Sequence, residues 1–168
     1  MKIPCWKYLL FSALLLTVAC AEEDCTNLDD PLLTIEFKTR FTTAAGQQRE
    51  RDTSLVVRHV YGVGKTPRDS LVRPGTYRSL ILPVNQRTDT TSFRILYYPA
   101  SDTSRTVRTG TISLRYRRQS FFVSDVCGFN IRYNDLDTIR AVMPLNQSLV
   151  IFKNTVDEAN TPNIRIFF

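Results

Sequence analysis

Residues 106–117 read TVRTGTISLRYR, and this stretch decides the fold. In its second half every other side chain is apolar: Ile112, Leu114 and Tyr116 alternate with Ser113, Arg115 and Arg117. Successive side chains of a β-strand point to opposite faces of its sheet. The period of two therefore predicts a long strand with one buried face and one wet face.

Shorter runs of the same kind fill the chain after residue 31. They are rich in Val, Ile, Phe, Tyr and Thr, which favour strands, and turn-forming residues separate them. We expect strands at 32–41, 55–62, 80–84, 92–98, 121–125, 129–134, 138–145, 149–153 and 163–168, with loops or turns at 42–52, 74–75 and 134–137. Nine or ten strands without an amphipathic helix predict an all-β domain, an antiparallel β-sandwich, with a small β-barrel as the alternative.

The amino terminus carries a targeting signal. Lys2 and Lys7 precede an apolar run at residues 8–19, which is too short to span a bilayer and has the length of a signal-peptide core. Ala19 followed by Cys20 resembles the lipobox of bacterial lipoproteins, although Thr17 stands where a branched aliphatic residue is usual. Plain secretory cleavage near Cys20 is the alternative.

Three segments follow from this interpretation. Residues 1–19 are a lipoprotein signal peptide, residues 20–31 an acidic linker lipidated at Cys20, and residues 32–168 the β-sandwich domain. Acyl chains such as palmitate on Cys20 would hold the domain at a membrane surface. Without residues 1–19 the chain has 20 basic and 16 acidic residues, a net charge of +4, and 149 residues, enough for one domain.

Four cysteines remain to be assigned. Cys5 is lost with the signal peptide and Cys20 takes the lipid, so Cys25 and Cys127 are left as one pair. In an oxidising envelope compartment this pair is expected to form a disulfide, with two unrelated thiols as the alternative. Two cysteines and the single His59 do not supply a tetrahedral metal site.

No catalytic set is recognisable. Residues 62–66 read GVGKT, but a phosphate-binding loop would need a further glycine at the position of His59, so a turn between strands is favoured. His59 itself sits in a strand pattern typical of a packed side chain. Asp135 and Asp137 are interpreted as turn residues rather than an acid–base pair. We therefore expect no enzyme activity and no cofactor.

Arginines are the most distinctive predicted surface feature. They accompany tyrosines near one predicted hairpin, and the candidate ligand-binding surface comprises Tyr97, Tyr98, Arg115, Arg117 and Arg118. Its partner would be anionic: an acidic glycan, a lipid headgroup or an acidic protein surface. The alternative is that these arginines only solvate a sheet and keep its edge from pairing. Nucleic acid is not expected as a partner of an envelope lipoprotein.

Four short motifs carry a resemblance to a known family: Glu22-Glu23-Asp24-Cys25, the first strand from Pro31 to Phe37, the stretch from Phe122 to Phe129, and the closing run from Asn163 to Phe168. They resemble small Bacteroidota lipoproteins catalogued as domain of unknown function 6452. The resemblance implies an all-β envelope lipoprotein and supports the pairing of Cys25 with Cys127. The acidic residues after Cys20 also resemble the stretch that marks surface export in such lipoproteins. No catalytic residues come with it.

These observations predict a non-enzymatic binding or assembly accessory module at the outer membrane. We expect it at the cell surface, with the periplasmic face as the alternative, beside an envelope protein such as an outer-membrane β-barrel. The second hypothesis is a surface glycan-binding module that uses exposed Tyr97, Tyr98 and the arginines.

Overall fold

The computed structural model describes residues 32–144, 148–156 and 161–168. These ranges hold ten strands and one short 3-10 helix, η2 (Pro67–Asp69). The strands are β1 (Leu32–Thr42), β2 (Gln48–Asp52), β3 (Leu55–Gly62), β4 (Gly75–Tyr77), β5 (Ser79–Pro83), β6 (Thr90–Pro99), β7 (Arg108–Ser124), β8 (Gly128–Val142), β9 (Ser148–Ile151) and β10 (Ile164–Phe167). The all-β prediction is confirmed. The predicted signal peptide and linker lie outside the described residues.

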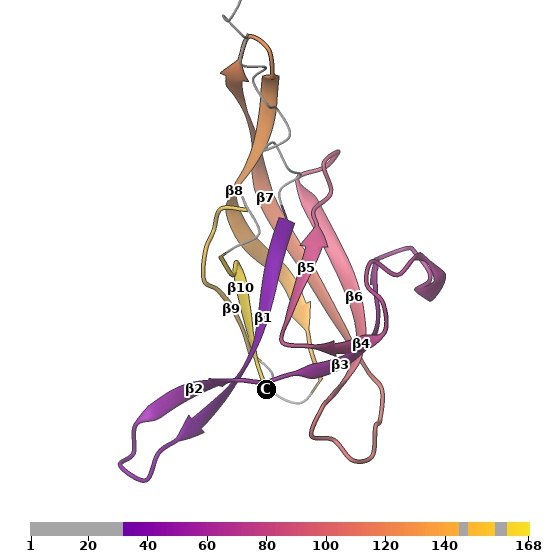
Figure 1. The fold of residues 1–168 in the computed structure, drawn as a ribbon, viewed down its shortest axis with the longest axis vertical. Coiled ribbons are helices and arrows are strands. Elements are labelled where there is room, and N and C mark those ends of the chain that lie inside the picture. Colours follow the sequence, from indigo (N-terminus) through magenta and orange to yellow (C-terminus); the bar gives the residue numbers. More distant parts are fainter. Residues whose placement is uncertain (1–31, 145–147, 157–160) are drawn as a thin grey trace, which may run out of the picture.

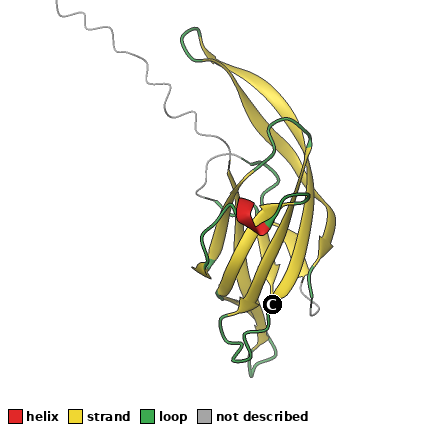
Figure 2. Cartoon of the chain, turned by 90° about the vertical axis from the view of Figure 1, so that its right-hand side faces the viewer, coloured by secondary structure: helices red, strands yellow, loops and turns green. Residues whose placement is uncertain are grey.

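The strands form two five-stranded sheets (Figure 1). One has the order β2-β1-β10-β9, with β5 also paired to β1, and the other the order β4-β3-β6-β7-β8. Neighbouring strands are antiparallel except β1 and β10, which are parallel. The described strands make two open layers, as Figure 2 shows from the side, so the sandwich prediction holds and the barrel alternative does not.

The hydrophobic core lies between the inner faces of the two sheets. Alternate residues of the longer inner strands are buried: Leu33, Ile35 and Phe37 from β1, Phe93, Ile95 and Tyr97 from β6, and Ile112, Leu114 and Tyr116 from β7. In β3 the alternation changes phase, because a bulge between Val57 and His59 brings both Val57 and Val60 inward.

The last residue joins the two sheets. The Phe168 ring meets Phe37 of one sheet and Tyr97 of the other edge to face, with centroids 5.9 and 5.8 Å apart. Its backbone N–H donates to Lys38 O at 2.9 Å. The carboxyl end is therefore docked, as the alternating run 163–168 predicts.

Two strands are longer than expected. The runs at 106–117 and 121–125 belong to one strand, β7, and the runs at 129–134 and 138–145 belong largely to β8. The predicted turn at 134–137 is wrong, because a register irregularity near Arg115 and Arg117 accommodates the turn-forming residues, with Asp135 at φ +53°. The resulting β7–β8 hairpin extends beyond the rest of the described chain (Figure 1).

Two further predictions need correction. Residues 42–52 were expected to be a loop, yet β2 lies within them and pairs with β1. All five of its residues are exposed, so no apolar alternation marks it. Residues 74–75 were expected to be a turn, but Gly75 begins the three-residue β4 at the edge of the other sheet.

Candidate functional site

The predicted tyrosine surface does not exist. Tyr97 is 0 % exposed and Tyr98 is 8 % exposed. Tyr97 faces the core and packs against Phe168, and the Arg58 guanidinium lies 5.8 Å from the centroid of the Tyr98 ring. Because the protein covers these rings itself, neither can stack on a sugar.

The strand register also separates the tyrosines from the arginines. Tyr97 pairs with Arg108, whereas Arg115 pairs with Thr90 at the other end of β6. Seven residues of strand correspond to about 23 Å. The fold therefore does not bring the five predicted ligand-binding residues together.

Two of the three candidate arginines have acidic partners. Arg115 Nη2 lies 2.9 Å from Asp137 Oδ2. Arg118 Nε donates to Asp89 Oδ1 at 2.6 Å, and its Nη1 donates to Gln86 O at 3.0 Å. Within the described part of the chain, the exposed side chain of Arg117 makes no ion pair or hydrogen bond, so it is the arginine of this group with a guanidinium open to a ligand.

A polar cleft of about 420 Å³ lies beside Arg117, at the base of the β7–β8 hairpin. Its lining residues are Arg117, Arg118, Gln119, Asn134, Asp135, Asn154 and Thr155. Asn134 Nδ2 donates to Gln119 Oε1 at 2.9 Å, which orients two of its amides. Amides, a guanidinium and a carboxylate together can bind hydroxyl or anionic groups. Asp135 and Asp137 do not act as a pair, since Asp137 is bound to Arg115.

The end of the hairpin carries an apolar surface that the sequence patterns did not single out. We call Phe122, Val123, Val126 and Phe129 the hairpin tip; they are 55, 37, 71 and 74 % exposed. The Phe122 and Phe129 rings pair across the strands with centroids 5.5 Å apart. The sequence does hold one signal of this apolar surface, because apolar residues occur inside a turn, where polar residues are usual.

The predicted cysteine pair involves this same turn. Cys127 lies between Val126 and Gly128, and its backbone N–H donates to Ser124 Oγ at 3.1 Å. Cys20 and Cys25 lie outside the described residues. The lipid attachment and the disulfide therefore remain predictions.

The hairpin is firmly held at its base. Tyr116 and Tyr133, each at most 2 % exposed, pack edge to face at 5.1 Å. The Tyr116 hydroxyl donates to Asn85 O at 2.7 Å, and burial raises the pKa of Tyr116 to about 12. Above Arg118 and Tyr133, β7 and β8 pair only with each other among the described residues.

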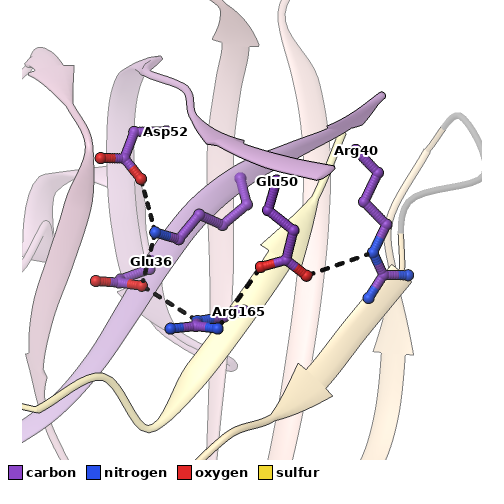
Figure 3. Close-up of polar contacts among 6 residues, drawn as sticks. Glu36, Arg40, Glu50, Asp52 and Arg165 are labelled. Carbon is purple, nitrogen blue, oxygen red and sulfur yellow. Dashed lines mark hydrogen bonds and ion pairs between the residues drawn. The ribbon is translucent and has the colours of Figure 1, made fainter. Parts of the chain in front are cut away.

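The outer face of the first sheet is a self-neutralised charge network (Figure 3). Asp52, Lys38, Glu36, Arg165, Glu50 and Arg40 form a chain of five contacts between 2.6 and 3.8 Å, with three charges of each sign. The hydrogen bond between Lys38 and Asp52 lowers the pKa of Asp52 and raises the pKa of Lys38. This face therefore offers little net charge to an anionic partner.

Residues 62–66 form a turn, as their two glycines predict. Gly64 has φ +90°, and Asp69 Oδ2 accepts hydrogen bonds from the backbone and hydroxyl of Thr66, both at 3.0 Å. This contact lowers the pKa of Asp69. The turn lines an open cavity of about 690 Å³ together with Thr90, Ser92 and their neighbours. A phosphate-binding loop is followed by a long helix, whereas the η2 that follows this turn has only three residues.

His59 is half-buried beside the bulge in β3, opposite Leu96. Its Nδ1 is buried and, among the described residues, has no hydrogen-bond partner. In those residues no three His, Cys, Asp or Glu side chains gather to hold a metal ion. None of their helices has the length and apolar composition of a transmembrane span either.

Comparison with known proteins extends these observations. A model described as a family of unknown function, DUF6452, matches residues 54–168, from the start of β3 to the carboxyl end. No curated protein matches the chain, and no solved structure does. The matched segment contains the polar cleft and the hairpin tip.

Proposed function

Because this chain belongs to DUF6452, a family of unknown function, we propose its role from its own residues. The protein is an outer-membrane lipoprotein that is anchored through Cys20 and serves as a non-enzymatic binding or assembly accessory at the cell surface. The observation that carries this proposal is the apolar run at residues 8–19. Two lysines precede this run, and Cys20 directly follows its last residue, Ala19.

The domain is suited to work at the end of such a tether. The acidic linker of residues 20–31 connects the lipid to β1, and the proposed disulfide between Cys25 and Cys127 fastens it to the hairpin. Closing a loop of about 100 residues would stabilise the fold by roughly 4–5 kcal/mol in the chain-entropy model. A long hairpin projecting from a rigid sandwich offers a surface for an envelope partner such as an outer-membrane β-barrel.

Membrane fractionation tests the anchor. The wild-type protein and the Cys5→Ser variant should both appear in the outer-membrane fraction and incorporate labelled palmitate, because Cys5 leaves with the signal peptide. The Cys20→Ser variant should incorporate no label and appear in the soluble envelope fraction. Equal membrane association of the Cys20→Ser variant would contradict the proposal, and protease digestion of intact cells distinguishes the cell surface from the periplasmic face.

Crosslinking of intact envelopes tests the accessory role. We expect the anchored protein to be recovered with a particular outer-membrane protein, and the soluble Cys20→Ser variant to lose that partner. If wild-type protein is recovered without any membrane protein at several crosslinker lengths, an assembly role is refuted.

A second candidate function, glycan binding, is favoured by the polar cleft rather than by the buried tyrosines. Arg117 has an open guanidinium beside the amides of Gln119 and Asn134. Binding to an array of acidic glycans should be lost in the Arg117→Gln variant and retained in Arg94→Gln, which alters an exposed arginine on β6. Absence of binding by the wild-type protein would eliminate this candidate.

A further inference from the structure

The hairpin tip stands apart from the body of the domain. β7 pairs with β6 only as far as Arg115, whereas its pairing with β8 continues from Arg117 to Ser124. The eight residues from Arg117 to Ser124 correspond to about 26 Å of two-stranded ribbon. Figure 1 shows this ribbon at the top of the molecule, so its end can reach a surface that the sheets do not touch.

Apolar groups occur on both faces of this ribbon end. Phe122 pairs with Phe129, while Phe121, the preceding residue of the strand, pairs with Asn130 on the opposite face. Val126 adds an exposed apolar side chain in the turn. A protein partner that docks on one face would leave the other apolar face in water. A lipid layer surrounds an inserted ribbon from all sides, so it suits this distribution better.

Below the tip the ribbon becomes polar and basic. Arg117, Arg118 and Arg132 lie there, and the Arg132 guanidinium is 4.9 Å from the centroid of the Phe121 ring. Asp89 binds Arg118 at 2.6 Å, so Arg117 and Arg132 are the ribbon arginines that have no acidic partner among the described residues, and the turn adds the acidic Asp125. Aromatic rings with arginines behind them are typical of membrane interfaces, where the cations meet lipid phosphates. The exposed Asp125 favours shallow, tilted insertion on the side of Phe122 and Phe129.

The start of β1 lies near the base of the ribbon. Leu32 pairs with Pro83 at the end of β5, and three residues further on Gln86 O accepts a hydrogen bond from Arg118 at the base of the ribbon. The twelve residues from Cys20 to Leu32 span at most about 40 Å. This span exceeds the length of the ribbon, which is about 26 Å.

We propose that the hairpin tip is a second membrane contact, which inserts into the headgroup layer of the phospholipid surface that carries the Cys20 anchor. This inference rests on the proposed function for the presence of the anchor, while the tip itself is argued from its own geometry. Tip insertion fixes the orientation of the domain, with the ribbon directed toward the membrane and the β6–β7 loop away from it.

A single tryptophan can report this insertion, because Trp6, the one tryptophan of the chain, lies in the predicted signal peptide. The Phe129→Trp variant places the reporter in the tip. Val107→Trp is the matched control: it replaces another exposed apolar residue, 48 % exposed, beside the far end of β7. Both proteins are studied lipidated, in phosphatidylcholine vesicles with one-fifth phosphatidylglycerol.

Brominated phosphatidylcholine should quench the tip reporter to about half its intensity or less, because insertion by 5–10 Å brings the indole to the acyl boundary. The control should be unaffected. In the Phe129→Trp background, Phe122→Ser should reduce the quenching while leaving the thermal unfolding temperature unchanged. Equal quenching of both reporters, or quenching of neither, overturns the proposal, as does a crosslink from the tip to an envelope protein without quenching.

A tethered form separates this test from the test of lipidation. The mature chain with Cys20→Ser and an amino-terminal hexahistidine tag is attached to the same vesicles through a nickel-chelating lipid. Quenching of the tip reporter in this form supports the tip contact even if cells do not lipidate Cys20. Labelled Cys20 with an unquenched tip reporter in both forms would refute the tip contact alone.

Discussion

Removal of the terminal aromatic ring should strongly destabilise the sandwich. Phe168 contacts Phe37 at 5.9 Å and Tyr97 at 5.8 Å, and so connects the two sheets across the core. Edge-to-face aromatic pairs contribute about 0.5–1.5 kcal/mol each beyond the area they bury. Truncation of a fully buried phenylalanine costs about 3–5 kcal/mol. Because Phe168 is only half-buried, we expect Phe168→Ala to lower the free energy of unfolding by about 2–4 kcal/mol.

Urea denaturation followed by circular dichroism measures this loss. With a denaturant slope of about 2 kcal/mol per M, the midpoint should fall by about 1–2 M. Phe129→Ala is the matched control, because it removes the same ring from an exposed position, and it should cost less than about 1 kcal/mol. If Phe168→Ala shifted the midpoint no more than Phe129→Ala, the account of the carboxyl end as a connection between the sheets would be refuted.

Three further predictions concern buried polar groups and the cysteine pair. Asn163, 2 % exposed, accepts the Thr34 N–H at 2.9 Å, so Asn163→Ala should cost about 1–3 kcal/mol in urea by leaving that donor unpaired. Burial raises the pKa of Tyr116 to about 12, so the neutral form stabilises the fold fully below pH ~10 and this contribution, about 2–3 kcal/mol, is lost as the pH rises through 12. The Tyr116→Phe variant should lose less stability over that interval. Reduction of the predicted Cys25–Cys127 disulfide should lower the free energy of unfolding by about 4–5 kcal/mol, and Cys127→Ser should make the protein insensitive to reductant.

Each of these has a contradicting outcome. An Asn163→Ala protein as stable as the wild type would mean that the amide does not hold β1 to the segment before β10. Identical alkaline unfolding of the wild type and Tyr116→Phe would show that this phenol does not control stability there. Two alkylatable thiols in the untreated mature protein would exclude the disulfide.

Alternation alone predicts most of the fold, because the sheets are buried on one face. Ile112, Leu114 and Tyr116 face the core as expected, and so do the alternate apolar residues of two other strands: Leu33, Ile35 and Phe37 of β1 and Ile164 and Ile166 of β10. Alternation fails to predict a strand where no side chain is buried or where the pairing register is interrupted. β2 carries no buried residue to mark it, and the irregularity near Arg117 allows turn-forming residues to lie inside a continuous β8.

The candidate site was less predictable, because it depends on register and on distant segments. Tyr97 was expected to be exposed beside the arginines, but Phe168, seventy-one residues further along the chain, covers it. Arg117 and Arg118 do share a cleft, yet Asn154 and Thr155 complete it from another part of the chain. Residues this far apart in sequence carry no local pattern that would reveal their contact.

Intact-mass spectrometry of the mature protein, purified from envelopes in detergent, tests the anchor most directly. The account predicts a chain that begins at Cys20, with residues 1–19 removed and with the added mass of a diacylglycerol group and its accompanying acyl chain. An unmodified Cys20, whether the signal peptide is cleaved or retained, would contradict it.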